Sequence, residues 1–335
     1  MSEILEQIIA KKDLTSKEMT HVMQGIVEGE FSNNYVAGLL IALRMKGESV
    51  DELVGAANFL RAKSTKLDLD MFDLVDTCGT GGDGLHTFNI STTSSFVAAA
   101  AGVKIAKHGG RSVSSASGSI DVLESLGINV NIDAAKLRKL ISTVGIGFMF
   151  AANFHPAMKV VAPIRKDLGV RTIFNLLGPL INPANVKKQI VGVFHKNFTA
   201  KLAEALLKLN SHSAMVVHSR DGMDEISMND ITYVAELKQG KILEYEIDPK
   251  KYNLHAEGNK SIIANSIEES KKILLSVLNN ENTDAKKIVI LNAAATIYIS
   301  GLANSYEDGI NIATLMIENQ KALALLDDLV RASHE

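Results

Sequence analysis

The sequence predicts an α/β protein in which a small N-terminal helical domain precedes a larger α/β domain with a central, mostly parallel sheet. Three observations lead to this prediction. Residues 1–70 show capped helical patterns and no plausible strand, and residues 71–335 alternate strand-like and helical runs. A content of 46% apolar and 22% charged residues is ordinary for a globular chain of 335 residues. We expect the domain boundary near residue 70.

Two capping boxes mark helix starts in the N-terminal part. Residues 15–18 and 49–52 each place a hydroxyl three positions before a glutamate, so that both side chains satisfy free backbone N–H groups. Apolar residues recur at helical spacing over 53–60. Between the two boxes, 35–45 has the composition of a third, largely buried helix.

The remaining chain carries the alternation that is typical of a parallel sheet covered by helices. We expect strands at 73–77, 101–107, 147–152, 189–194 and 213–218. We expect helices at 119–126, 200–209 and 293–332. The charged stretch 238–251 predicts a hairpin or an exposed strand pair, and part of 155–185 is expected to pack on the N-terminal helices.

Charge and cysteine content exclude several classes of protein. The net charge of −3 provides no basic excess for binding nucleic acid. The only cysteine, Cys78, has no partner for an internal disulfide. The acidic, amphipathic N-terminus does not resemble a secretory signal, and no apolar run is long enough to span a bilayer. We expect a cytoplasmic protein that binds neither nucleic acid nor membrane.

A glycine-rich loop, residues 79–84, follows the first expected strand and precedes a helix that opens with four hydroxyl residues, 91–94. Glycines allow successive backbone N–H groups to converge on an anion, and the helix start adds free N–H groups and a positive dipole end. The spacing matches neither the dinucleotide fingerprint nor the P-loop. The alternative is a tight structural turn, but the hydroxyl residues favour a phosphate site.

Two further clusters follow expected strands. Residues 107–119 combine Lys107 with glycines and serines, which suit phosphate, although the same composition fits a solvated loop. Asp224 and Glu225 lie on an acidic turn and are hard oxygen ligands of the kind that magnesium uses together with substrate phosphates. An isolated acidic turn is usually only solvated. Loops after strands of one sheet meet at its carboxyl edge, however, where α/β proteins bind ligands.

In this order, these clusters resemble the anthranilate phosphoribosyltransferase family. The resemblance extends from the N-terminal helices to the C-terminal tail and is strongest over 76–183. The matching segments are 79–83, 89–92, 107–109, 117–119, 155–158, 163–165, 171–180 and 224–225.

The resemblance implies a fold like that of nucleoside phosphorylases and phosphoribosyltransferases. It also implies the transfer of a phosphoribosyl group from phosphoribosyl pyrophosphate (PRPP) to the amine of anthranilate in tryptophan synthesis, with magnesium and a homodimer. The implied PRPP ligands are Gly79, Gly82, Asp83, Thr87, Asn89, Ser91, Thr92, Lys107, Ser115 and Ser119. The implied magnesium ligands are Ser91, Asp224 and Glu225. The implied anthranilate ligands are Gly79, His108, Gly110 and Arg165, of which His108 and Arg165 are the candidate catalytic residues.

The chemistry of the reaction agrees with these roles. Displacement at the anomeric carbon develops negative charge on the departing pyrophosphate, which cations and N–H donors stabilise. The aniline nitrogen is already nucleophilic, so alignment matters more than a strong base. Arg165 can bind the anthranilate carboxylate through two parallel hydrogen bonds, the alternative being a surface salt bridge. His108 is a polar wall or a weak base, and we favour the wall.

One position departs from the family pattern. Gly110 stands where the family usually has asparagine, so that no side-chain amide is offered to the acceptor. Three consequences are compatible with this change: backbone or water replaces the amide, the affinity for the acceptor is lower, or the acceptor differs.

Two other functions are compatible with parts of the pattern. Pyrimidine nucleoside phosphorylases share the fold, but they carry a Lys-His-Ser run directly before their glycine loop, where this chain has Asp76-Thr77-Cys78. A non-catalytic, nucleic-acid-binding relative would need a basic stripe and would lose the acidic pair at 224–225. The negative charge and the acidic pair argue against it.

Overall fold

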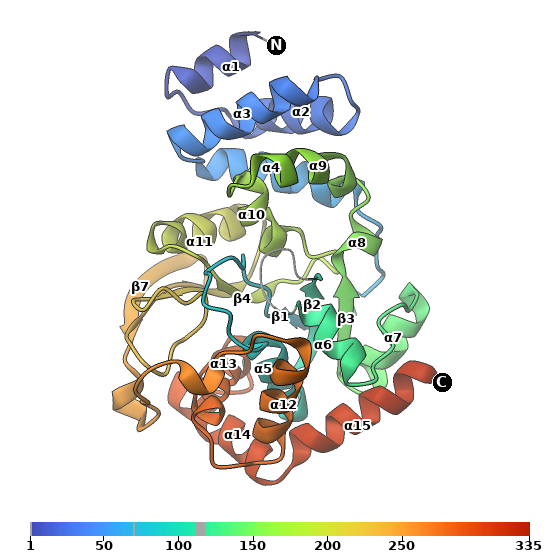
Figure 1. The fold of residues 1–335 in the computed structure, drawn as a ribbon, viewed down its shortest axis with the longest axis vertical. Coiled ribbons are helices and arrows are strands. Elements are labelled where there is room, and N and C mark those ends of the chain that lie inside the picture. The colour runs from blue at the N-terminus through green and yellow to red at the C-terminus, as the bar shows by residue number, and fades with distance from the viewer. Residues whose placement is uncertain (1, 70, 112–117) are drawn as a thin grey trace.

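The computed structural model describes residues 2–69, 71–111 and 118–335 of the chain. A helical domain lies at one end of the molecule. Next to it is a seven-stranded sheet with helices on both faces (Figure 1). Ser115, a predicted PRPP ligand, lies outside the described residues. Within the described residues, no helix is both long and apolar enough to cross a membrane.

Four helices form the N-terminal domain. Both predicted capping boxes are confirmed, because Thr15 and Ser49 accept from the backbone N–H groups of Glu18 and Glu52, whose side chains bond back. The buried side of the fourth helix includes Leu53, Ala56, Ala57 and Leu60, as predicted. The helices are α1 Ser2–Ile9, α2 Ser16–Val27, α3 Asn33–Lys46 and α4 Val50–Lys63.

A segment from the middle of the chain packs on these helices. It contains α8 (Ala151–Phe154), α9 (Met158–Leu168), α10 (Ile173–Leu177) and the short 3-10 helix η1 (Gly178–Ile181). Helix α9 contacts α2 and α3, while α10 and η1 contact α4. In Figure 1, α9 accordingly lies with the helical domain, above the sheet.

The sheet has the order β3-β2-β1-β4-β5-β6-β7. Strands β1 to β5 run parallel, and β6 and β7 are antiparallel additions at one edge, which confirms the mostly parallel sheet. The strands are β1 Leu74–Asp76, β2 Lys104–Gly109, β3 Ile146–Phe150, β4 Lys188–Gly192, β5 Ser213–Ser219, β6 Thr232–Lys238 and β7 Lys241–Ile247.

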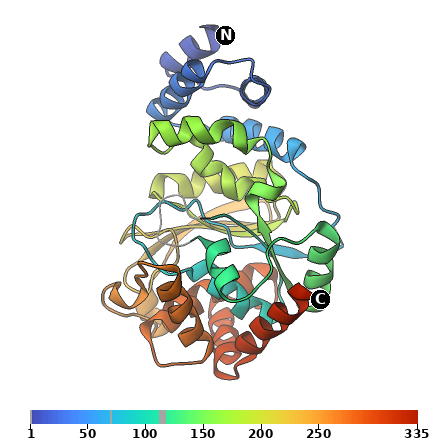
Figure 2. The ribbon, with the colours of Figure 1, turned by 45° about the vertical axis from the view of Figure 1, so that its right-hand side comes forward.

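Helices cover both faces of the sheet (Figure 2). Alternate strand residues feed two cores: Ile190 packs with α5 and α12–α15, while the next residue, Val191, packs with α11 and the helical domain. A smaller third core lies between α7 and β1–β3. These covering helices are α5 Ile90–Ala100, α6 Ser119–Ser125, α7 Ala134–Thr143, α11 Thr199–Lys208, α12 Ile267–Leu278, α13 Asp284–Ser300, α14 Tyr306–Glu318 and α15 Lys321–His334. The remaining 3-10 turns are η2 Lys196–Phe198, η3 Pro249–Tyr252 and η4 Lys260–Ile262.

Two element predictions need correction. The strand expected at 101–107 begins only at Lys104, because α5 continues to Ala100 and Gly102, with φ +104°, ends it. The strand pair expected at 238–251 occupies 232–247, and the positive φ angles of Gln239 and Gly240 make its two-residue hairpin turn. The charged residues of the sequence indicated only the exposed strand β7. Helices α7 and α12 were not expected.

The strand order fixes where a ligand site can form. From β1 the chain adds β2 and β3 on one side, and later β4 and β5 on the other side. Loops at the carboxyl ends of β1 and β4 therefore diverge, and α/β proteins bind ligands at such a switch point.

Glu52 links three segments of the helical domain, and replacing it tests how the domain is held. Its carboxylate pairs with the buried Lys46 ammonium at 3.0 Å and accepts from the backbone of Leu14 and Ser49. Glu52→Ala is expected to lower the free energy of unfolding by about 2–4 kcal/mol, because it removes the buried carboxylate partner of Lys46, which keeps only the exposed Asp13 carboxylate and the Gly47 carbonyl, and leaves the N–H groups of Leu14 and Ser49 without their acceptor. Glu18→Ala removes the equivalent, partly exposed residue of the other capping box, and should cost about 1 kcal/mol or less. Equal losses in urea denaturation would contradict the assignment.

Candidate functional site

The glycine loop between β1 and α5 is fixed by contacts to neighbouring strand ends. Gly81, Gly82 and Gly84 have φ angles of +64°, +80° and +80°, a conformation that favours glycine. The N–H of Gly81 donates to Asp224 Oδ2 at 2.9 Å, and the N–H of Thr80 donates to the Gly192 carbonyl at 2.8 Å. The loop after β1 is thereby joined to the end of β4 and to the turn that carries Asp224.

Gly192 allows the closest approach in the site and was not predicted as a site residue. A Cβ atom at this position would lie 1.6 Å from the carbonyl oxygen of Asp224. At Gly79, a Cβ would lie 3.2 Å from Asp224 Oδ2. A lone glycine inside an expected strand signals a close backbone approach, and that signal was present at 189–194.

Lys107 and Ser91 meet in the centre of the site. Lys107 lies on β2 and is 3% exposed. Its Nζ donates to the Thr77 carbonyl at 2.6 Å and to Ser91 Oγ, in the first turn of α5, at 3.2 Å. Beside Ser91 lies a cavity of about 10 Å³, lined by Gly79, Asp224, Glu225 and others, which is about the room one water needs.

Asp224 and Glu225 lie on the turn after β5, and their surroundings raise the pKa of both carboxyl groups. Burial, followed by the neighbouring Asp83 carboxylate, raises the pKa of Asp224. Burial, followed by Asp224, raises the pKa of Glu225 to about 8, while Lys107 opposes the shift. Three carboxylates in this space repel one another, so the site favours a bound cation.

The donor set fits magnesium that is completed by a substrate. Among the residues that the structure describes, no group of three or more His, Cys, Asp or Glu side chains forms a metal site on its own. Magnesium is commonly held by one or two carboxylates and by substrate phosphates. Asp224 and Glu225, with the hydroxyl of Ser91 beside them in the same cavity, match that pattern.

The side chains of the α5 start are supported from the far end of the chain. Thr87 forms a bridge to Ile263, and Asn89 caps α5 and accepts from Ser270 of α12 at 3.0 Å. Thr92 Oγ1 is buried, and no described residue gives it a hydrogen-bond partner. Asp83 Oδ2 is likewise buried without a donor among the described residues.

The second predicted loop leaves β2 and reaches α6, where Ser119 is the first residue. The hydroxyl of Ser119 lies beside the backbone and donates to the Gly110 carbonyl at 3.4 Å. A Cβ at Gly109 would lie 2.3 Å from this hydroxyl, whereas a Cβ at Gly110 would meet no atom of the described residues within 4 Å. The position where the resembling family has asparagine is therefore open.

His108 is buried and uncharged. Burial, and then His155 at a ring distance of 5.2 Å, lower the pKa of His108 to about 3, while the Gly178 carbonyl opposes the shift. Neither ring nitrogen has a hydrogen-bond partner among the described residues. At neutral pH the ring is therefore uncharged and a poor proton acceptor, and its role as a wall stays a prediction.

Arg165 lies on α9, at the helical-domain side of the site. Its guanidinium is 5.8 Å from the centre of the Phe174 ring, and burial lowers its pKa. Among the described residues it forms neither an ion pair nor a side-chain hydrogen bond, so the predicted alternative of a surface salt bridge is not observed. The structure does not bring Arg165 into direct contact with Gly79 or His108.

Arg171 is a second residue that the sequence analysis did not assign. Its guanidinium donates to the carbonyl of Gly82 and lies 4.4 Å from the centre of the Phe194 ring. Its own carbonyl accepts from Arg44 of α3 at 2.8 Å. Arg171 thus joins the glycine loop to the helical domain, across a sequence separation that no local pattern reveals.

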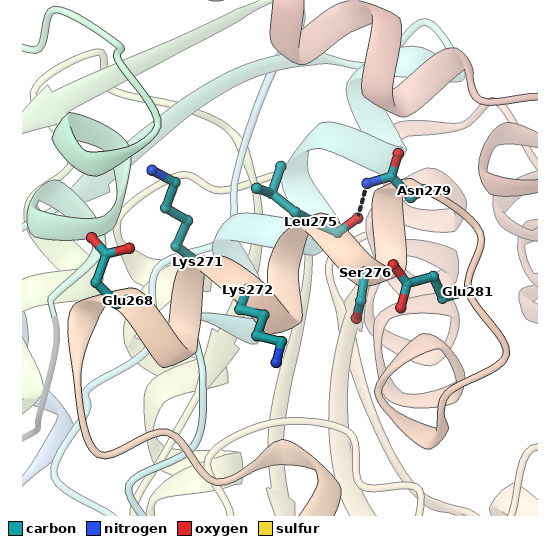
Figure 3. A pocket seen from close by; sticks show the side chains of 7 residues that line it. All are labelled: Glu268, Lys271, Lys272, Leu275, Ser276, Asn279 and Glu281. Carbon is teal, nitrogen blue, oxygen red and sulfur yellow. Dashed lines mark hydrogen bonds between the residues drawn. The ribbon is translucent and has the colours of Figure 1, made fainter.

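A larger hollow, of about 280 Å³, lies on the surface of α12 and not at the strand ends. Figure 3 shows its lining: Lys271 and Lys272 point to different sides of the helix, and Asn279 bonds the backbone of Leu275. Because this hollow lies away from the carboxyl ends of the strands, where α/β proteins bind ligands, the strand-end site remains the candidate.

Two family models match the chain. Residues 2–64 match the helical bundle domain of a glycosyl transferase family, and residues 72–323 match its a/b domain. An anthranilate phosphoribosyltransferase from Polynucleobacter asymbioticus is 52% identical over 99% of this chain and 97% of its own length.

Two solved anthranilate phosphoribosyltransferases are similar to this chain in fold. The anthranilate phosphoribosyltransferase of Thermus thermophilus has a TM-score of 0.92 and 36% identity, covering 99% of both chains. The enzyme of Saccharomyces cerevisiae, solved in complex with PRPP and Mg, has a TM-score of 0.88 and 27% identity, covering 100% of this chain and 99% of its own. It has also been solved in complex with 4-fluoroanthranilate.

The low pKa of His108 predicts how stability depends on pH. In the unfolded chain the imidazole has its ordinary pKa of 6.5, and in the folded protein the pKa is about 3. Between these values only the unfolded state takes up the proton, so this contribution to stability is present above pH 6.5 and is lost as pH falls.

His108→Gln should therefore lose less stability than the wild type between pH 8 and pH 5, by about 2 kcal/mol. The measurement is urea denaturation at the two pH values. Other titrating groups are common to both proteins and largely cancel in the difference. Identical losses in both proteins would mean that His108 is not held neutral.

Proposed function

The chain belongs to the anthranilate phosphoribosyltransferase family, and on this premise we propose that it transfers the phosphoribosyl group of PRPP to the amine of anthranilate. The amine nitrogen forms a bond to the anomeric carbon, the bond from that carbon to the pyrophosphate oxygen breaks, and the nitrogen loses a proton. The observation that carries the proposal is the meeting of the glycine loop, Ser91, Lys107 and the pair Asp224–Glu225 at one switch point of the sheet.

The donor PRPP occupies this switch point. Backbone N–H groups of the glycine loop, with Gly79, Gly82 and Asp83, and the start of α5, with Thr87, Asn89, Ser91 and Thr92, surround the phosphates. Lys107 adds a positive charge, and Ser119 closes the site from α6. Magnesium, held by Ser91, Asp224 and Glu225 together with the pyrophosphate, would neutralise the charge of the leaving group. The carboxylates of Asp224 and Glu225, whose pKa values burial and mutual repulsion raise, support a cation there.

Anthranilate binds between His108, Gly79, Gly110 and Arg165. The guanidinium of Arg165, which has no carboxylate partner within the described part of the chain, is free to bind the anthranilate carboxylate. His108 is neutral and shields the acceptor from water. Gly110, where no atom of the described residues would meet a Cβ, offers the acceptor no side-chain amide of its own.

The homodimer and the cytoplasmic location remain predictions from the sequence. Sedimentation equilibrium of the purified chain tests the first.

The most direct test follows the loss of anthranilate fluorescence with PRPP and magnesium. We expect consumption that depends on both. Phosphate-dependent cleavage of a pyrimidine nucleoside, without any anthranilate consumption, would instead support a nucleoside phosphorylase.

The acidic pair tests the metal assignment. Asp224→Asn with Glu225→Gln should reduce magnesium-dependent turnover by roughly two orders of magnitude or more while the fold persists, because the charge on the leaving group is no longer neutralised. Asp221→Asn is the matched control. Asp221 lies in the same turn but accepts from Ser227 and Met223, away from the site. Full turnover in the double variant would refute the assignment.

Arg165 tests the acceptor side. Arg165→Ala should raise the KM for anthranilate by about tenfold or more and leave the KM for PRPP almost unchanged, because a charge-assisted bond to one substrate is lost. Arg165→Lys should recover only part of the effect, since an ammonium cannot form two parallel bonds. Lys166→Ala, at the exposed neighbour, is the control. Equal changes in both KM values would contradict a carboxylate-binding role.

A further inference from the structure

Asp76, the last residue of β1, is fully buried and belongs to neither proposed substrate site. Strand β1 pairs with β2 only at Leu74 and Val75, while β2 continues to Gly109 along β3. Beyond Val75, β1 therefore provides no backbone partner for β2. The carboxylate of Asp76 takes that place, because its Oδ1 accepts the backbone N–H of His108 at 3.0 Å.

The second carboxylate oxygen is bound by Asn182, which is also buried. Asn182 Nδ2 donates to Asp76 Oδ2 at 2.7 Å and to the carbonyl of Ala106 at 3.0 Å, while its Oδ1 accepts the N–H of Ala184 at 2.8 Å. Because each end of the amide has a matching partner, its orientation is fixed. Burial raises the pKa of Asp76 to about 6, with Lys107 and Asn182 opposing, so the carboxylate is charged at neutral pH and accepts both bonds.

These bonds converge on Lys107. The carbonyl of Ala106 belongs to the peptide unit before Lys107, and the N–H of His108 belongs to the unit after it. Asn182 binds the first and Asp76 binds the second. Both peptide units that flank Lys107 are therefore fixed by side chains, and its ammonium is directed to the Thr77 carbonyl and to Ser91.

Asn182 is itself connected to the helical domain. The neighbouring Leu180 carbonyl accepts from Nε of Arg61, on α4, at 2.6 Å. On the sheet side, the Pro179 carbonyl accepts from Gln189, on β4, at 2.8 Å. The segment around Asn182 is thus bound from both domains before it reaches Asp76.

We propose that Asp76 and Asn182 form a positioning pair that holds Lys107 in place for the phosphates of PRPP. This inference rests on the proposed function. The pair touches no substrate; it acts through the two peptide units beside Lys107. Its contribution is to donor binding, and not to the acceptor pocket around Arg165.

The test compares single and exchanged variants. Asp76→Asn places an amide N–H₂ against one of two donors, the His108 N–H or Asn182 Nδ2, and should raise the KM for PRPP and its Kd at saturating magnesium by at least about tenfold. The KM for anthranilate should change much less. Asp76→Asn with Asn182→Asp restores a matched donor and acceptor between the two side chains but leaves the Ala106 carbonyl without its donor, so it should recover only part of the PRPP affinity.

Gln189→Met is the matched control. Gln189 is buried, pairs with Asp76 in the sheet register and bonds the same segment, but it touches neither peptide unit beside Lys107. It should lower Tm without changing the KM for PRPP. If Asp76→Asn does not fold, Asn182→Ala, which releases the Ala106 carbonyl, one carboxylate oxygen and the Ala184 N–H but keeps the bond from His108 to Asp76, replaces it in the comparison.

The outcomes distinguish a failure of the positioning role from a failure of the proposed function. Unchanged PRPP affinity in Asp76→Asn, or an equal change in Gln189→Met, would overturn the positioning role. If the exchanged double variant recovers Tm but not PRPP affinity, that would overturn it as well. A wild type that binds PRPP with magnesium by calorimetry but consumes no anthranilate would refute the proposed function, and the calorimetric comparison of the variants would still decide the role of the pair.

Discussion

The buried ammonium of Lys107 is the constraint on which the rest of the site depends. An ammonium that is 3% exposed must find its hydrogen-bond partners and its compensating charge within the protein. Its direct partners are a carbonyl and a hydroxyl, and at neutral pH the opposing charge comes from the Asp76 carboxylate. The excess of carboxylates over cations leaves the centre electrostatically incomplete. A magnesium ion and a polyphosphate bound together would balance the charges of the site better than either would alone.

Holding these charges together requires an unusually close approach of three strand ends. At Gly192 and Gly79 the backbone comes within contact of the Asp224 turn, so larger residues would separate β1, β4 and β5 at their carboxyl ends. The glycines of the loop itself have a different role, since their positive φ angles allow the tight turn in which the Gly81 N–H donates to Asp224. Close approach and N–H direction are thus provided by different glycines of one small region.

Local features of this protein were predictable from sequence, and long-range ones were not. The capping boxes at Thr15 and Ser49 depend on residues three positions apart, so a short window contains all the information. The three loops were predicted to meet because parallel strands end at one edge. The contacts of Arg171 with Gly82, of Arg61 with Leu180 and of Asn182 with Asp76 join residues between 89 and 119 positions apart. Nothing in the neighbourhood of either partner indicates them, and Gly192 alone left a readable signal.

The two substrate sites are built on different parts of the molecule. The residues proposed for PRPP lie on β2, in the loop after β1, at the start of α5 and at the start of α6, whereas Arg165 lies on α9, which packs on α2 and α3 of the helical domain. The distance between the two reactants is therefore set by how the helical domain sits on the sheet. Two series of hydrogen bonds control that placement. One runs from Arg44 through Arg171 to the glycine loop. The other runs from Arg61 through the segment around Asn182 to Asp76. Both end at groups that hold the donor site, so a displacement of the helical domain would move the acceptor and disturb the donor loops together.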